Sequence, residues 1–321
     1  MAPYLDPTNQ AVVNAGAKAG GPKLYELSFV EAREALEGAQ KHTPATDIVT
    51  EEISVTVDVA PGKKSTVKTI IYKPAKGIVG ESAGTVFFFH GGGWILGSPK
   101  THDRLVRDLV RESGLPIVFP YYTPAPDAQY PIQFEENYGV LKHVVEHGAE
   151  HGLNTGKIAF VGDSVGGNMA IAMSALTAER HGPRPVFQVL FYPVTDTLRE
   201  FDTYKEFKHG PGLELATLMW MVHAFLPVSD DRAGHIASPL LSHTEQLVRQ
   251  PPTLLITAGV DPLRTQGEEF AHALQQVGVP TAVFRADGQV HDFVMLNAVA
   301  TNPTAVATIE LAALKLRKAL G

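Results

Sequence analysis

Gly162-Asp163-Ser164-Val165-Gly166 is the stretch of sequence that decides the fold class. It follows a short apolar run, 157–161, that has the length of a buried strand, and it precedes an apolar segment of helical length, 165–180. Glycines on both sides of Ser164 permit the tight strand-to-helix turn that lifts a serine hydroxyl clear of a sheet. The helix N-terminus at this turn favours negative charge nearby. The five residues therefore predict a nucleophile elbow with Ser164 at its tip.

A second glycine-rich stretch, His90-Gly91-Gly92-Gly93-Trp94, comes directly after the apolar run Thr85–Phe89. Three consecutive glycines leave backbone N–H groups unobstructed, so these groups can converge on the oxygen anion of a tetrahedral intermediate. We expect Gly92 and Gly93, together with Val165 of the elbow, to form an oxyanion hole. A phosphate-binding loop is the rival interpretation, but the stretch lacks the Lys-Ser/Thr pair of a P-loop and the glycine spacing of a dinucleotide fingerprint.

Strand-length apolar runs alternate with helical patterns along most of the chain. Two β-rich runs, 53–59 and 67–73, flank turn-forming residues at 60–65, so the sheet is expected to open with an antiparallel hairpin. The later runs are apolar throughout and are joined by helices, which is typical of a parallel sheet covered on both faces. The sequence therefore predicts an α/β fold with an eight-stranded, mostly parallel sheet. The remaining strands are expected at 85–89, 116–121, 157–161, 186–192, 253–257 and 281–285, and the helices at 103–113, 130–150, 165–180, 265–277 and 303–320.

Two segments interrupt this alternation. Residues 1–45 predict one or two helices before the sheet begins, and residues 197–245 contain an amphipathic helix, 213–226, without a neighbouring strand. Ligands of open α/β folds bind at the carboxyl ends of the strands. We therefore expect both segments to form a helical cap over that edge, with residues 46–196 and 246–321 as the catalytic domain.

An acid and a histidine should follow the nucleophilic serine in chain order, on loops after late strands. Asp261 follows the run 253–257, and His291 follows the run 281–285. His291 would accept the Ser164 proton and return it to the leaving group, while the carboxylate of Asp261 would fix the histidine tautomer. Asp287 and Asp292 are the rival acids, because both lie close to His291 in the sequence.

These motifs, in this order and spacing, resemble the hormone-sensitive-lipase family of α/β-hydrolases over residues 45 to 321. The resemblance implies an α/β-hydrolase fold with a helical cap, and hydrolysis of carboxylic esters through an acyl-Ser164 intermediate without cofactor or metal. Two stretches depart from the family pattern: Val165 replaces a usual alanine, and residues 121–127 replace the usual Asp-Tyr-Arg-Leu-Ala-Pro-Glu. The resemblance also includes Gly162-Asp163-Ser164-Val165-Gly166-Gly167-Asn168, Asp261-Pro262-Leu263-Arg264, His291-Asp292-Phe293, Gly210-Pro211-Gly212-Leu213 and Ser238-Pro239-Leu240-Leu241.

The triad does not record the leaving group, so amidase and lactonase activities stay open beside esterase activity. A non-catalytic, ligand-binding protein of the same fold is the alternative from another class, and an intact set of Ser164, Asp261 and His291 argues against it. Trp94, beside the oxyanion loop, is the candidate substrate contact. Because only the short cap segments are available to enclose the acyl group, we expect short- to medium-chain esters, about two to eight carbons, to be preferred.

Composition excludes several other classes of function. The net charge is −7 without a long run of one sign, so no footprint for nucleic acid or anionic membrane is present. The absence of cysteine excludes disulfides, thiolate metal sites and a cysteine nucleophile. No apolar stretch approaches the length of a membrane span, and no leader pattern is visible. We expect a cytoplasmic protein whose partner is a small ester, with a homodimer as an open possibility.

One histidine cluster suggests a metal site instead. His143-Val144-Val145-Glu146-His147 matches the inverted zinc-protease pattern, and His151 follows on the same helical face. The surrounding lysine and glutamates favour a solvated helix face. We therefore expect no metal here.

Overall fold

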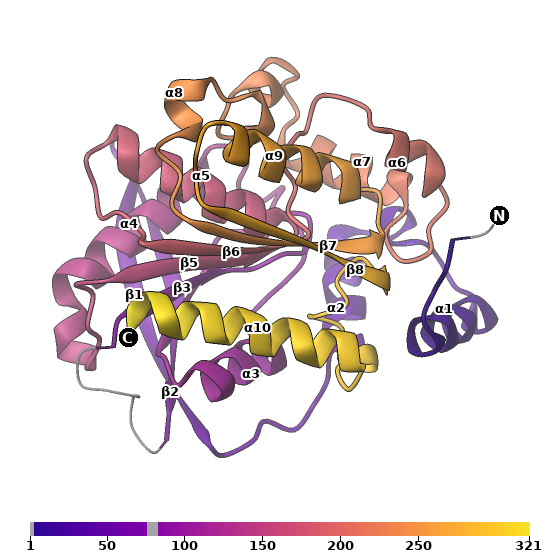
Figure 1. The fold of residues 1–321 in the computed structure, drawn as a ribbon, viewed down its shortest axis with the longest axis horizontal. Coiled ribbons are helices and arrows are strands. Elements are labelled where there is room, and N and C mark those ends of the chain that lie inside the picture. The colour runs from indigo at the N-terminus through magenta and orange to yellow at the C-terminus, as the bar shows by residue number, and fades with distance from the viewer. Residues whose placement is uncertain (1–2, 76–82) are drawn as a thin grey trace.

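The computed structural model describes residues 3–75 and 83–321. An eight-stranded sheet crosses the molecule in the order β1-β2-β4-β3-β5-β6-β7-β8 (Figure 1). β1 (Ile48–Ala60) and β2 (Lys63–Pro74) form an antiparallel hairpin, and β2 pairs antiparallel with β4, whereas the other neighbours run parallel. The predicted α/β-hydrolase architecture is thereby confirmed. The remaining strands are β3 (Thr85–Phe89), β4 (Ile117–Tyr121), β5 (Ile158–Asp163), β6 (Phe187–Phe191), β7 (Thr253–Val260) and β8 (Thr281–Val290).

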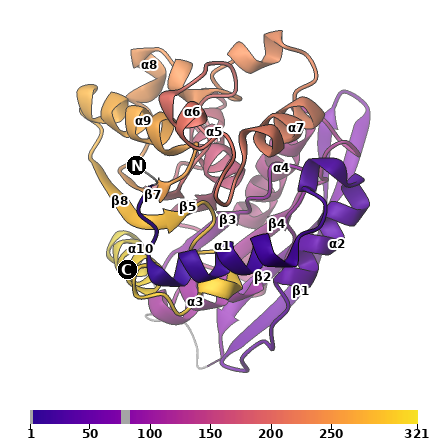
Figure 2. The same ribbon diagram turned by 90° about the vertical axis from the view of Figure 1, so that its right-hand side faces the viewer.

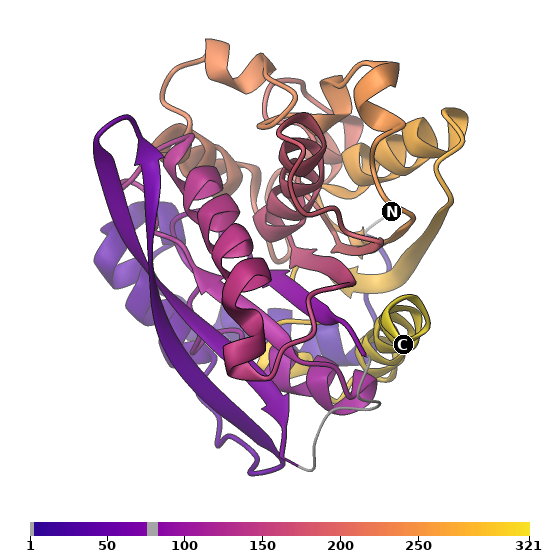
Figure 3. The same cartoon turned by 90° about the vertical axis from the view of Figure 1, so that its left-hand side faces the viewer.

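Helices cover both faces of the sheet, which explains why the central strands are apolar throughout. Every residue of β3 is buried, with Val86 and Phe88 in the core on one face and Phe87 and Phe89 in the core on the other. On one face α3 (Asp103–Ser113) packs beside α10 (Pro303–Leu320), and on the other lie α4 (Ile132–His147), α5 (Val165–Glu179) and α9 (Arg264–Gln276) (Figure 1). Figure 3 shows α4 lying against the long β1–β2 hairpin, with which it shares much of its contact surface.

The ends of two helices match the sequence prediction because local signals fix them. α10 begins at Pro303, after Asn302, whose side chain accepts the backbone N–H of Thr304 as an N-cap. α3 ends before Gly114, which has the left-handed conformation of a helix C-cap. β7 and β8 extend further than predicted, to Val260 and Val290. Asp261 and His291 are therefore the first residues after these two strands, at the carboxyl edge of the sheet.

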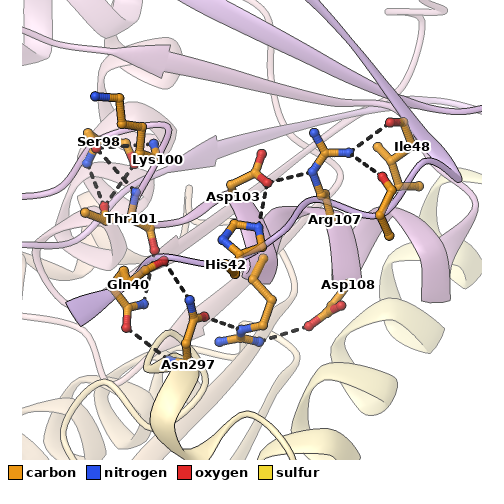
Figure 4. Close-up of polar contacts among 12 residues, drawn as sticks. Gln40, His42, Ile48, Ser98, Lys100, Thr101, Asp103, Arg107, Asp108 and Asn297 are labelled. Atoms are coloured by element: carbon orange, nitrogen blue, oxygen red, sulfur yellow. Dashed lines mark hydrogen bonds and ion pairs between the residues drawn. The ribbon is translucent and has the colours of Figure 1, made fainter. Parts of the chain in front are cut away.

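Residues 3–45 form an arm that contains α1 (Pro7–Ala19) and α2 (Phe29–Ala39). Figure 2 shows α1 and α2 along one side of the molecule, with α7 (Leu215–Phe225) nearby. Gln40 ties the arm to the rest of the chain: its amide donates to the carbonyls of Thr101 and Met295 and its amide oxygen accepts the N–H of Asn297 (Figure 4). The arm thus contacts the segment that follows His291.

The start of the arm is held by a second, buried network. The carboxylate of Asp6 accepts the backbone N–H of Asn9, at 2.8 Å, as the N-cap of α1. It also accepts the side-chain amides of Gln289 and Asn302, which flank His291 in the sequence. The two anchors, at Asp6 and Gln40, hold the arm against the carboxyl edge of the sheet.

The inserted segment 197–245 contains α6 (Asp202–Glu206) and α7, and the expected helix at 213–226 is confirmed as α7. Trp220 of α7 stacks on Phe29 of the arm, with ring centroids 5.1 Å apart. Lys23 of the arm pairs with Glu214 at the start of α7, at 2.5 Å. α7 and the arm therefore form one layer next to the oxyanion loop. The shorter elements are the 3-10 turns Leu24–Glu26, Gly148–His151, Asp230–Ala233, Pro239–Leu241 and Asn297–Val299, and α8 (Thr244–Leu247).

Within residues 3–75 and 83–321, no helix is both long enough and apolar enough to cross a membrane.

Candidate active site

Ser164 lies at the turn between β5 and α5, where the chain reverses in a strained conformation. Its φ of 55° and ψ of −120° are unusual for a residue with a side chain. The turn also depends on close backbone approach: a Cβ on Gly166 would strike the carbonyl of Phe89, and one on Gly162 would strike the backbone of Gly166. Only glycine fits at these two positions, so the helix can start against the strand and lift Ser164 above the sheet.

Asp261, His291 and Ser164 form a continuous chain of hydrogen bonds at the carboxyl edge. Nδ1 of His291 lies 2.7 Å from Oδ2 of Asp261, and Nε2 lies 3.0 Å from Oγ of Ser164. Asp261 follows β7 directly and His291 follows β8 directly, so two neighbouring strands deliver acid and base. The backbone N–H of Leu263 donates to Oδ1 of Asp261 at 2.9 Å. This geometry suits a serine nucleophile, a general base and an orienting acid.

The charges around His291 change its proton affinity. Burial by itself lowers the pKa of the imidazole, because the charged form loses its water. The carboxylates of Asp261 and Asp292 more than offset this effect and raise the pKa of His291 to about 9. The rival acid Asp287 is exposed on β8, away from this chain. In the structure, Nδ1 of His291 thus faces the carboxylate of Asp261, and Nε2 faces that of Asp292.

The glycine loop is fixed by a carboxylate that the sequence analysis did not single out. Asp163 lies between Gly162 and Ser164 in the elbow and is completely buried. Its carboxylate accepts the N–H of Gly91 at 2.9 Å, and Nε2 of His102 lies 3.1 Å from the same group. Gly92 and Gly93 follow with φ values of 106° and 64°. Asp163 therefore joins the elbow to the loop in which the predicted oxyanion donors lie.

His90 supports this loop from below. Its ring stacks on Tyr122, with centroids 4.1 Å apart, and its Nδ1 donates to the carbonyl of Gly91 at 2.8 Å. Burial, with the nearby His102, lowers the pKa of His90 to about 3, so the ring is neutral at physiological pH. A neutral ring can pack in the core without a counter-ion, so the role of His90 is to support the glycine loop by packing.

Trp94 is fully buried, and its indole stacks on Phe225 of α7 with centroids 4.3 Å apart. It does not line the cavity next to His291. What the structure shows is therefore a packing link between the glycine loop and α7, and a direct contact between Trp94 and substrate stays a prediction.

The stretch 121–127, which departs from the family pattern, is tied to the arm. Arg33 of α2 donates to the carboxylate of Asp127 at 3.0 Å, and to the carbonyls of Ala125 and Ile95. These three bonds hold the stretch and the end of the glycine loop together from the arm side. No local sequence signal indicates this contact, because Arg33 and Asp127 are 94 residues apart.

A cavity of about 370 Å³ opens next to His291. Apolar side chains from the arm, the glycine loop and α7 make most of its wall, and Asp292 and the Lys23–Glu214 ion pair are its charged groups. A larger groove of about 830 Å³ adjoins it and shares Lys23 and Glu214 with it. The smaller cavity therefore combines an apolar lining with His291 and with Gly92 of the glycine loop. Its apolar lining includes Pro22, Leu24, Leu36, Leu96, Leu213, Met221 and Leu296.

Another cavity, of about 440 Å³, lies between the end of the arm and α3. Its polar side chains bind one another: Nε2 of His42 lies 2.8 Å from Asp103, and Arg107 donates to Asp103 and to the carbonyls of Ala45 and Ile48 (Figure 4). Lys100 pairs with Glu37 on the rim. These bonds hold the arm against α3. This cavity does not contain the reactive groups of the cavity next to His291.

The histidine cluster on α4 does not form a metal centre. His143 and His147 lie side by side, with ring centroids 4.6 Å apart, but His151 turns away and binds Glu51. Throughout the described ranges, no group of three or more histidine or acidic side chains is arranged to hold a metal ion. The expectation that no metal is needed stays a prediction.

Fold and site together define a class: a serine hydrolase with a mostly parallel sheet flanked by helices. A family model described as "alpha/beta hydrolase fold" matches residues 86–295, more than half of the chain. The chain belongs to this α/β-hydrolase family, and the resemblance to the hormone-sensitive-lipase branch is confirmed.

The relatives include several esterases. The chain is 41% identical to an esterase of Gibberella moniliformis over 317 residues, 98% of this chain and 97% of the relative. It is 29% identical to an ethyl acetate hydrolase of Pseudomonas putida over 302 residues, 93% and 92% of the two chains. The crystal structure of a thermostable esterase from Pseudomonas putida superimposes with a TM-score of 0.94 at 35% identity, covering 100% of this chain and 99% of that one. The predicted serine-hydrolase and carboxylesterase class is confirmed.

Proposed function

We propose that the protein hydrolyses small carboxylic esters through an acyl-Ser164 intermediate, with His291 as general base and Asp261 as its orienting acid. The observation that carries the proposal is the hydrogen-bonded chain from Asp261 through His291 to Ser164, at 2.7 and 3.0 Å, beside an apolar cavity. Small ester substrates are what the esterase relatives imply.

The two half-reactions use the same groups. In acylation, Ser164 Oγ attacks the ester carbonyl carbon while Nε2 of His291 takes the hydroxyl proton, and that proton then passes to the departing alcohol. The N–H groups of Gly92, Gly93 and Val165 would hold the carbonyl oxygen while it is negative. In deacylation, His291 takes a proton from water, the resulting hydroxide attacks the acyl carbon, and Ser164 recovers its proton.

We expect the acyl preference to fall within about two to eight carbons. Each methylene buried in the cavity adds about 0.8 kcal/mol to binding until the space is full. Beyond the cavity the chain would meet the Lys23–Glu214 ion pair, which lies at the boundary with the larger groove. The similarity to an ethyl acetate hydrolase supports small acyl groups.

A panel of p-nitrophenyl esters from acetate to palmitate, with matched anilides and lactones, tests the proposal. We expect kcat/KM to peak at or below eight carbons and then to fall, with esters cleaved faster than the anilides. A maximum at twelve carbons or more would indicate a lipase. Faster cleavage of the anilides would indicate an amidase, and faster cleavage of the lactones would indicate a lactonase. The absence of any p-nitrophenol release above the uncatalysed rate would favour a non-catalytic binding protein.

The proposal also includes the cap, the location and the assembly state. We propose that residues 1–45 and 197–245 act as the cap over a catalytic domain of residues 46–196 and 246–321, in a cytoplasmic protein that binds neither nucleic acid nor membrane. We propose a homodimer, for which the edge strand β8, with Phe284 51% exposed, is the candidate surface. Light scattering after size exclusion decides the assembly state, and cell fractionation decides the location.

A further inference from the structure

A second carboxylate lies at the catalytic histidine, on the side opposite to Asp261. Oδ1 of Asp292 is 3.4 Å from Nε2 of His291. Nε2 is the same atom that lies 3.0 Å from the hydroxyl oxygen of Ser164. Each nitrogen of the imidazole therefore faces a carboxylate, Asp261 at Nδ1 and Asp292 at Nε2.

The backbone holds Asp292 in this position. Its φ of 66° is in the left-handed region, which the loop after β8 adopts as it turns away from the sheet. The N–H groups of Met295 and Leu296 donate to the carbonyl of Asp292 and close that turn. The side chain is 24% exposed and lines the same cavity as His291. Asp292 is therefore built into the wall of the proposed substrate site.

The carboxylate of Asp292 is poorly compensated. Its Oδ1 is buried and accepts no hydrogen bond from the described residues. Burial raises the pKa of Asp292, and the positive charge of His291, with a smaller effect of His102, opposes this rise. A buried carboxylate oxygen without a hydrogen bond is costly unless a positive charge lies next to it. The group that the structure places next to Oδ1 is His291, which supplies that charge when Nε2 carries a proton.

The other charged groups around His291 are already engaged. Asp261, after β7, accepts the N–H of Leu263, and Asp163, at the end of β5, accepts the N–H of Gly91. Tyr192, after β6, packs its ring edge on the imidazole, and burial raises the pKa of its hydroxyl well above 10, so it stays neutral. On the cap side, Lys23 and Glu214 neutralise each other.

We propose that Asp292 is a second carboxylate partner of the catalytic base, which stabilises the imidazolium of His291 from the Nε2 side. The proposal rests on the proposed function of His291. When His291 is neutral, the lone pair of Nε2 accepts the Ser164 hydroxyl and repels the nearby Oδ1 of Asp292. When Oγ attacks the ester, its proton moves to Nε2, and the new N–H⁺ faces Asp292 with an attractive charge. Asp292 keeps its own protonation state and makes His291 a stronger base.

A stronger base is protonated up to a higher pH, so the enzyme is active over a narrower pH range. This dependence on pH makes the proposal testable. The base must be neutral to act, so kcat/KM falls as the pH drops below the pKa of His291. Removing the charge of Asp292 lowers that pKa and moves the acid limb to lower pH. It also weakens the base, so the rate on the alkaline plateau should fall. A merely structural loss would reduce kcat/KM by the same factor at every pH.

Asp292→Asn removes the charge and keeps the size, and asparagine tolerates the left-handed backbone. With p-nitrophenyl butyrate between pH 5 and 10, we expect the acid limb of kcat/KM to move down by about one pH unit or more, with a lower plateau. Asp287→Asn is the matched control, because Asp287 is exposed on β8, and its profile should superimpose on that of the wild type. If Asp292→Asn folds poorly, Asp292→Gly allows the same φ and should show the same displacement.

An acid limb that stays in place in both variants, with or without a loss of rate, would overturn the proposal. A second readout needs no substrate: NMR titration of the His291 ring should show the same downward displacement in Asp292→Asn. If the wild type hydrolyses no ester but the ring titration moves, the proposed function fails while the electrostatic coupling stands. If esters are hydrolysed and neither readout moves, the coupling fails alone.

Discussion

The hydrogen bonds around Asp261 determine how an asparagine would sit in its place. The N–H of Leu263 donates to Oδ1 at 2.9 Å, and Nδ1 of His291 lies 2.7 Å from Oδ2. In Asp261→Asn, the amide oxygen has to accept the Leu263 N–H, which turns the amide NH₂ toward His291. Since two donors cannot face each other, Nδ1 loses its proton and Nε2 carries it. That tautomer cannot accept the proton of Ser164.

The expected loss is large because the site offers no alternative. Asp261 is completely buried, so no bulk water replaces the missing acceptor. A wrong histidine tautomer in a serine triad reduces kcat by about 10³ to 10⁴, which corresponds to about 4 to 5.5 kcal/mol of transition-state stabilisation. The substitution keeps size and shape, so the melting temperature should change little.

Steady-state hydrolysis of p-nitrophenyl butyrate at pH 8, with the melting temperature of each variant, measures this loss. Asp287→Asn is the control and should retain nearly full activity, because Asp287 is exposed, whereas Asp261 and His291 are buried. A loss of less than tenfold in Asp261→Asn, with the fold intact, would refute the tautomer argument. A larger loss in Asp287→Asn would transfer the role of the acid to that residue.

Two further variants test the loop and the arm. Gly93→Ala should lower kcat by about 10- to 100-fold, because a Cβ at this positive φ strikes Met221 and displaces an oxyanion donor. Gly62→Ala is the control: this glycine has a similar φ but lies in open space, so kcat should stay unchanged. Equal kcat values in the two variants would contradict this prediction. Asp6→Ala removes the carboxylate that three side-chain amides donate to, so the free energy of unfolding should fall by about 1 to 3 kcal/mol. Urea unfolding measures this loss. An unchanged urea midpoint would show that other contacts hold the arm.

Features with a local physical cause could be predicted from the sequence. The elbow at Ser164 needs glycine on both sides, and the start of α10 is marked by Asn302 and Pro303. The apolar runs revealed a sheet covered on both faces, because buried strands need no polar alternation. The order of Ser164, Asp261 and His291 followed from the topology of such a fold, and the structure brings these three side chains within hydrogen-bonding distance.

Features that depend on long-range packing could not be predicted. Asp6 meets Gln289 and Asn302 across more than 280 residues, and no periodicity records such a contact. The motif alone assigns no role to Asp163, because the direction of its side chain depends on the glycine loop that packs over it. In the sequence Asp292 is a rival acid, but in the structure its Oδ1 lies 3.4 Å from Nε2 of His291, whereas Asp261 lies at Nδ1.

Covalent labelling tests the central claim, that Ser164 is the nucleophile, most directly. The protein is incubated with a fluorophosphonate, digested, and analysed by mass spectrometry, with Ser164→Ala as the control. We predict a single adduct on Ser164, complete loss of esterase activity in proportion to labelling, and no adduct on Ser164→Ala, whose melting temperature should stay close to that of the wild type. An adduct on another residue, or undiminished hydrolysis by Ser164→Ala, would contradict the account.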